Sequence, residues 1–340
     1  MPRVNRERAK APFIAAAVCP RWRSVVINTP ALLRYLALPS RDEDTGFGTS
    51  YNSTIRYIKN VLKRSKADPI DIFIDYFDCE DNLFEPLHLL GQHADRWRRF
   101  ALTFALTCVG STGGLAKALN CGTPQLWSLW LSQQVEKSAT GIDRRTDPNL
   151  FHNHDQIFPY TPALTAYHLV NLNPSLTASV NHESPIVFLV NLKLHTVTVD
   201  TWNHLRNIAS RIGRLKLRSD YVHPGAIRTD VKLPYLHQLH IKGKGGDAAF
   251  NLPNFSSSPI DDLLLIAHTL SPSYHLLRVV CGTIYLLHFT GTTVGQDKDI
   301  PVLTPLCSLR HFTLFRGTLQ STLLGRLSQT GTDQPMWLKL

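Results

Sequence analysis

The chain has 340 residues, of which 43% are hydrophobic and 18% are charged, and its formal net charge is +10. This composition excludes a disordered chain, and no apolar run approaches the roughly 20 residues that a membrane-spanning helix needs. The six cysteines lie far apart with no C-x-x-C pair, which is typical of buried thiols in a reducing compartment. We therefore expect a folded protein of the cytoplasm or the nucleus.

The first predicted element is a helix that precedes Pro30. The apolar residues that recur with the spacing of one helical face are Val18, Cys19, Trp22, Val25 and Val26. Pro30 is expected to end this helix, because proline disfavours the helical conformation in the residue before it. We assign residues 1–32 to this short helical segment.

From residue 33 onward the chain repeats one pattern, in which apolar side chains recur with the spacing L-x-x-L-x-L. Segments that match at all three positions begin at Leu33, Trp97, Leu126, Leu164, Leu189, Ile212, Leu236, Ile284 and Leu309. Segments that keep only the last two positions are Ile72-Ile74, Leu264-Ile266 and Leu338-Leu340. From Leu169 onward the final positions are about 23–26 residues apart, which is inside the period of leucine-rich repeats.

A repeat of this kind cannot bury its apolar edge alone, so the repeats are expected to stack into a solenoid. We predict an α/β fold: an irregular leucine-rich-repeat solenoid of about twelve degenerate repeats over residues 33–340, with parallel strands on the concave face and helices or loops on the convex face. Polar, turn-rich insertions predict loops near 39–54 and 133–160. Helical spacing is clear in two return segments, which contain Ile55, Ile58, Val61 and Leu62, and Trp202, Leu205 and Ile208.

The run V-C-P-R-W-R from Val18 to Arg23, followed by T-P-A-L-L from Thr29, resembles the second half of an F-box. Residues 58–70, 93–100 and 233–241 are also similar to the F-box-like leucine-rich-repeat proteins of mushroom-type fungi. The resemblance implies that this segment binds the Skp-type adaptor of a cullin–RING (SCF) ubiquitin ligase, through Val18, Cys19, Trp22, Val25, Pro30 and Leu32. It also implies that the repeats capture the protein to be ubiquitinated.

The first half of the F-box motif, a helix that contains a Leu-Pro pair, has no match in residues 1–12. Two alternatives therefore stay open beside the ubiquitin-ligase adaptor. One is a leucine-rich-repeat scaffold without a ligase link, and the other is a truncated gene model.

The residues on either side of the final leucine of each repeat are expected to face solvent on the concave sheet. In three neighbouring repeats these residues are basic: Lys193, Lys216 and His240 before the leucine, and His195, Arg218 and Lys242 after it. The next repeat continues the two rows with Leu265 and Ala267. Because cations on adjacent strands repel unless an anion lies over them, the pattern predicts an acidic or phosphorylated protein partner. The alternative is an ordinary solvated face on a basic chain.

No pattern favours an enzyme, a cofactor or a metal site. The Gly110–Lys117 run does not have the order of a phosphate-binding loop, and His152 and His154 are better explained by a polar loop than by a metal pair. Nucleic acid is a weaker alternative partner, because the basic residues are scattered and no known nucleic-acid module occurs. We expect a non-catalytic protein-recognition subunit.

Overall fold

The computed structural model describes residues 6–38, 51–75, 84–105, 117–134, 158, 160–170, 188–197, 199–207, 211–222, 232–243, 258–266, 276–278, 281–290, 293–294, 299–303, 306, 308–316 and 318–319. The chain divides into two compact units, Met1–Ser184 (unit 1) and Pro185–Leu340 (unit 2).

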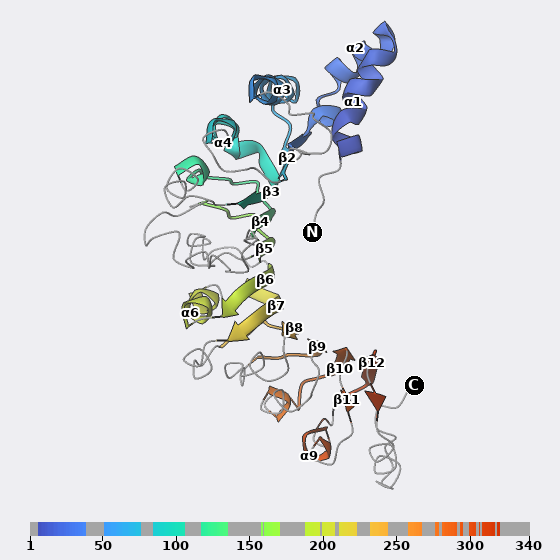
Figure 1. Cartoon of the computed structure of the whole chain (residues 1–340), viewed down its shortest axis with the longest axis vertical. Helices are drawn as coiled ribbons and strands as arrows, with labels where there is room; N and C mark the ends of the chain where they lie inside the picture. Colours follow the sequence, from blue (N-terminus) through green and yellow to red (C-terminus); the bar gives the residue numbers. More distant parts are fainter. Residues whose placement is uncertain are drawn as a thin grey trace, which may run out of the picture. The chain divides into compact units, whose positions relative to one another are not determined.

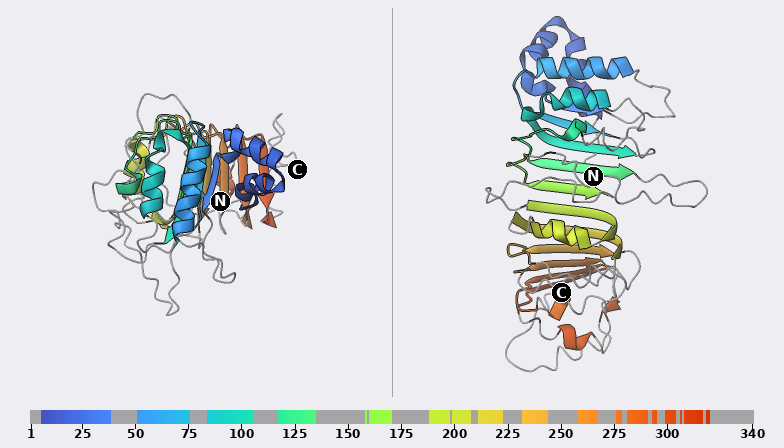
Figure 2. Two further views of the ribbon diagram at one scale, coloured as in Figure 1. Left: turned by 90° about the horizontal axis from the view of Figure 1, so that it is seen from above. Right: turned by 90° about the vertical axis from the view of Figure 1, so that its left-hand side faces the viewer.

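Unit 1 consists of two N-terminal helices and a sheet of parallel strands (Figure 1). Its helices are α1 (Arg6–Val18), α2 (Pro20–Asn28), α3 (Tyr51–Arg64) and α4 (Phe84–Gly91), with the 3-10 helices η1 (Pro30–Leu33) and η3 (Ala94–Arg96). Its strands are β1 (Tyr35–Leu38), β2 (Ile70–Ile74), β3 (Trp97–Ala105), β4 (Ser128–Gln134) and β5 (Ala166–Val170). Each strand pairs in parallel with the next one along the chain. Helices α3 and α4 cover one face of this sheet, and the α1–α2 pair lies on its other side (Figure 2).

Unit 2 continues the same plan. Its strands are β6 (Phe188–Val197), β7 (Ile212–Val222), β8 (Gln238–Gly243), β9 (Asp262–Ile266), β10 (Leu286–Thr290) and β12 (His311–Phe315), paired in parallel in that order. A second ladder joins β11 (Thr293–Val294) and β13 (Thr318–Leu319). Helices α6 (Val199–Asn207) and α9 (Ile300–Leu303) lie on one face of the main sheet. We call the opposite face the open face.

The structure is therefore a parallel-strand solenoid with some helices, as the repeat spacing predicts. Eleven of the predicted strand positions carry a strand of the main sheets, and the remaining one, Leu338-Leu340, lies outside the described residues. The predicted helix with Ile55, Ile58, Val61 and Leu62 is α3, and all four side chains are buried. Because α3 begins at Tyr51, the helix includes the last residues of the insertion predicted near 39–54. The rest of that insertion, and most of 133–160, lies outside the described residues.

The repeated apolar positions stack across the strands in straight rows. In unit 1 one row joins Leu38, Ile74, Leu102, Leu131 and Leu169, and each of these side chains is buried. In unit 2 the equivalent row joins Leu192, Leu217, Ile241, Leu265, Phe289 and Leu314. Each repeat thus buries its apolar edge against its neighbours, which is why several repeats are needed for a stable core.

A tight turn precedes several strands and places the first apolar residue of the template. In the turns that end at Leu126, Leu164 and Leu236, the leucine N–H donates to the carbonyl of the residue three positions earlier. Each of these turns has proline at its second position, Pro124, Pro162 and Pro234, where the fixed φ of proline suits a turn. The Pro-x-Leu pattern is therefore a second repeat signal in this chain.

The predicted alignment was wrong in two repeats. In β9 the buried residues are Leu263 and Leu265, and Ile260 supplies the first position, so the repeat matches the full template one residue before Leu264-Ile266. The sequence alone does not distinguish the two alignments, because either Leu263 with Leu265 or Leu264 with Ile266 could be the buried pair. In β6 the buried residues are Val190 and Leu192, and a register irregularity between Phe188 and Leu189 shifts the pairing away from Leu194. A bulge of this kind cannot be read from apolar spacing.

The predicted single helix before Pro30 was also wrong. Helix α1 ends at Val18 and α2 begins at Pro20, with Cys19 extended between them at φ −160°. Proline is favoured in the first turn of a helix but forces the preceding residue out of the helical region. Pro20 therefore divides the segment, and Val18 and Trp22 belong to different helices. The end of α2 before Pro30 agrees with the prediction.

Candidate functional site

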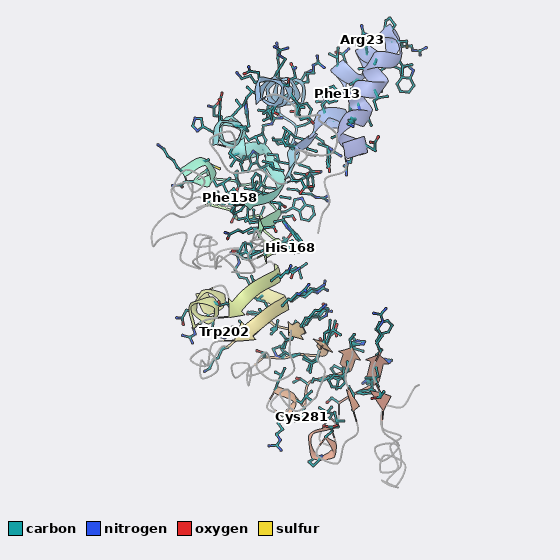
Figure 3. All side chains as sticks on the ribbon, viewed as in Figure 1. Phe13, Arg23, Phe158, His168, Trp202 and Cys281 are labelled. Atoms are coloured by element: carbon teal, nitrogen blue, oxygen red, sulfur yellow. The ribbon has the colours of Figure 1, made fainter. Side chains whose placement is uncertain are left out.

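The α1–α2 pair forms a helical hairpin that is anchored to unit 1 by its inner side. Ala9 of α1 packs against a buried cluster on the sheet, which consists of Tyr35, Ala37, Phe73 and Ala101. The guanidinium of Arg8 lies 4.6 Å from the centre of the Tyr35 ring, and the rings of Phe13 and Tyr57 are 5.8 Å apart (Figure 3). Between the two helices, Arg23 Nε donates to the Ala16 carbonyl at 3.1 Å. These contacts hold the hairpin in a defined position on the sheet.

The same hairpin, together with the 3-10 helix η1 that follows it, also carries large apolar side chains that face solvent. These residues, which we call the hairpin surface, are Ile14, Val18, Trp22, Val25, Ile27 and Leu32. Val18 is 67% exposed and Trp22 53% exposed, whereas the adjacent Val26 is 2% exposed. Large apolar side chains that stay exposed close together in the chain are a feature of protein-binding sites. Of the residues predicted to bind an adaptor, Val18, Trp22, Val25 and Leu32 thus lie on this surface, whereas Cys19 and Pro30 are half-buried.

The second candidate surface lies on the open face of unit 2. There Lys193 of β6 pairs with Arg218 of β7, and Arg218 pairs with Lys242 of β8. We call Lys193, Arg218 and Lys242 the basic row. All three side chains are exposed, and the strands that carry them are about 4.8 Å apart. Within the described part of the chain, no ion pair involves any of the three.

This register corrects the predicted arrangement of the basic residues. Lys216 pairs with Asn191 and with His240, and it does not pair with Lys193. His195 lies two residues beyond Lys193 on β6, and its side chain is outside what the structure describes. Lys193 therefore lies two residues further along β7 than expected, and the irregularity at the start of β6 accounts for one of these two residues. The result brings three exposed cations into one row, and places Lys216 and His240 in a second row beside it.

The second row is less exposed than the first. Lys216 and His240 are both half-buried. Burial, with the positive charge of Lys216 as a further cause, lowers the pKa of His240. The imidazole is therefore mostly neutral at pH 7, and the positive charge of the surface comes from lysine and arginine.

Past β8 the open face changes from basic to apolar. The residue in line with the basic row is Ile266 on β9, then Thr290 on β10 and Phe315 on β12. Leu264 continues the second row next to His240, and Phe315 is 56% exposed. We call Leu264, Ile266 and Phe315 the apolar strip. A change to an apolar surface after the three basic repeats was predicted through Leu265 and Ala267, but Leu265 is buried and Ala267 lies outside the described residues. The full template match at Ile260 is the signal that could have placed Leu264 and Ile266 on this face instead.

Comparison with known proteins does not assign this chain to a family. No family model matches the sequence, and no curated protein matches it. Among the described residues, no helix is long and apolar enough to cross a membrane, and no group of three or more histidine, cysteine or acidic side chains could hold a metal. Gly110–Lys117 and the pair His152 and His154 fall almost wholly outside the described residues.

Proposed function

We propose that this chain is a non-catalytic protein-recognition subunit, namely an F-box-type substrate adaptor of an SCF (cullin–RING) ubiquitin ligase. In this proposal the hairpin surface binds a Skp-type adaptor, and the open face of unit 2 captures the protein to be ubiquitinated. Such a protein acts in the cytoplasm, the nucleus or both. The leucine-rich-repeat identity of the solenoid is part of the same proposal.

The observation that carries the proposal is the contrast between buried and exposed apolar side chains in the segment from α2 to η1. Val26 and Leu33 are buried, whereas Trp22, Val25 and Leu32 of the same segment face solvent. Full burial of a side chain of this size contributes roughly 1.5–3 kcal/mol, so a partner that covers these side chains would gain binding free energy from each of them. The exposed residues include most of those that the resemblance to the F-box assigns to adaptor binding.

The alternative is a repeat scaffold that has no ubiquitin-ligase link. It is consistent with the resemblance, which covers only the second half of an F-box, from Val18 to Leu33. The hairpin surface then binds a partner other than a Skp-type adaptor.

Co-purification of the chain with a Skp-type adaptor distinguishes the two functions. We expect the unmodified chain to retain the adaptor and Trp22→Asp to lose it. Tyr235→Asp is a matched control, because Tyr235 of unit 2 is also 53% exposed. We expect the chain with this substitution to retain the adaptor. Failure of the folded, unmodified chain to retain the adaptor would favour the scaffold function.

A further inference from the structure

The open face of unit 2 has the chemistry of a site for one phosphorylated residue followed by apolar residues. The basic row supplies three exposed cations from adjacent strands, and Lys216 lies in the row beside it. A phosphoryl group carries up to two negative charges on three acceptor oxygens. It can therefore contact several of these cations at once, which a single carboxylate with two oxygens does less well.

Few acidic residues lie on the strands of this part of the face. Asp220 is two residues past Arg218 on β7, and its side chain is outside what the structure describes. The nearest acidic side chain that the structure does describe is Asp262 on β9, in the row of Arg214 and Gln238. Its carboxylate lies 3.8 Å from His288 Nε2 on β10, away from β6 and β7. Mutual repulsion within the basic row is thus not offset by a described acidic partner, and an anionic ligand would remove it.

The apolar strip next to the basic row indicates where apolar residues of the ligand would bind. Ile266 on β9 is one strand past Lys242, and Phe315 on β12 is two strands further on. With strands about 4.8 Å apart and an extended peptide rising about 3.3 Å per residue, a group above Arg218 is roughly three residues from Ile266 and roughly six from Phe315.

We propose that the open face of unit 2 binds a protein segment with a phosphorylated serine or threonine over the basic row, and with apolar residues about three and six positions away over Ile266 and Phe315. This inference rests on the proposed function, because it names the class of protein that the adaptor captures. It commits to a phosphorylated protein, since the apolar strip has no counterpart in a nucleic-acid backbone.

The test uses two fluorescent peptides that differ only in direction. One contains pSer-Ala-Ala-Leu-Ala-Ala-Leu, and the other contains Leu-Ala-Ala-Leu-Ala-Ala-pSer. Fluorescence anisotropy with the full chain is expected to show saturable binding of one of them, at least tenfold tighter than the same peptide with unmodified serine. The loss of one charge-assisted hydrogen bond is worth about tenfold in affinity, so Arg218→Glu and Lys242→Glu are each expected to weaken binding by tenfold or more.

Lys232→Glu is the matched control, because Lys232 is exposed on unit 2 but lies outside the basic row, and it should change the affinity less than threefold. Ile266→Ser tests the apolar part. It is expected to weaken binding of the leucine peptide about fivefold or more and to leave an all-alanine phosphopeptide unaffected.

Three results would overturn the inference. The first is equal affinity for the phosphorylated and the unmodified peptides, and the second is no binding of either phosphopeptide. The third is that a ten-nucleotide single-stranded RNA binds more tightly than the phosphopeptides and that Arg218→Glu and Lys242→Glu abolish this RNA binding. Adaptor retention, measured on the same protein preparations, reports on the hairpin surface alone. A chain that retains the adaptor but fails with the peptides would therefore contradict this inference and leave the proposed function intact.

Discussion

Lys193 lies directly opposite Arg218 across the parallel ladder of β6 and β7. Like charges at directly opposed positions destabilise a sheet, so this pair opposes the stability of the strands that carry it. Neighbouring positions in the second row hold Asn191 and Lys216, which do not repel each other. The repulsion is thus concentrated in the basic row, where the proposed phosphorylated ligand would bind.

Removal of one charge from the basic row is expected to stabilise the protein. We predict that Arg218→Gln raises the free energy of unfolding by about 0.5 kcal/mol at low ionic strength, because Arg218 is flanked by Lys193 and Lys242. The gain should vanish near 0.5 M NaCl, where charges are screened within a few ångströms. Urea denaturation at the two salt concentrations measures both values, and a gain that persists at high salt would contradict the electrostatic cause.

The corrected register of β9 predicts opposite behaviour for two adjacent leucines. Leu265 is fully buried, so Leu265→Ala is expected to cost about 3 kcal/mol of stability. Leu264 is only half-buried on the open face, and Leu264→Ala is expected to cost less than about 1 kcal/mol. Thermal or urea unfolding of both variants distinguishes this register from the one in which Leu264 is buried, because the latter reverses the order.

An ion pair on the sheet of unit 1 is expected to matter more than an ordinary surface pair. The Arg98 guanidinium donates to both carboxylate oxygens of Asp71, with Nε at 2.8 Å from Oδ1. These hydrogen bonds raise the pKa of Arg98, and the Asp71 side chain is 1% exposed. Arg98→Ala would leave a buried carboxylate without this partner.

We predict that Arg98→Ala lowers the free energy of unfolding by about 2 kcal/mol. This value lies below that of a fully buried pair, since the Arg98 side chain is 28% exposed and its interactions are partly screened. Addition of Asp71→Asn to Arg98→Ala should recover part of the loss, because the neutral amide is less costly to bury. Urea denaturation of the single and double variants checks this, and a double variant less stable than Arg98→Ala would argue against it.

The pH dependence of stability is expected to include a contribution from His240. Burial and Lys216 lower the pKa of this imidazole, with smaller effects from Arg214 and His288 in the same direction and from Asp262 in the opposite direction. Between this lowered pKa and the ordinary value near 6.5 the unfolded state binds more protons than the folded state, so stability falls as the pH drops below about 6.5. His240→Gln should make this decline shallower, as measured by thermal unfolding between pH 7.5 and 5. An unchanged slope would show that other groups cause it.

Much of the solenoid could be predicted because its signal is local and repeated. The side chains at Leu129 and Leu131, or at Leu239 and Ile241, are buried wherever the chain makes the same turn and strand, and each repeat is bounded by similar residues. Helix α3 could be predicted for the same reason, since Ile55, Ile58 and Val61 follow the period of one helical face.

The errors occurred where a local pattern allows two solutions. Three consecutive leucines, Leu263, Leu264 and Leu265, fit the template in two alignments, and only the pairing with β8 and β10 selects one. At Pro20 the apolar spacing continues across a helix boundary. The spacing therefore predicted one helix, although the proline divides the segment into two. Both cases show that spacing alone does not set the register of a strand or the end of a helix.

The sequence by itself determined that a parallel strand recurs about every 24 residues and that the repeated apolar positions form the core. It also determined that basic residues lie on β6, β7 and β8. Only the tertiary structure decided which of those residues meet. The pairing of β6 with β7 differs by two residues from the expected alignment, one of which comes from the irregularity between Phe188 and Leu189, and this register brings Lys193 opposite Arg218. The physical reason is that backbone pairing, which is long-range, sets which side chains are neighbours across a sheet, whereas apolar spacing reports only which face of its own strand a residue occupies.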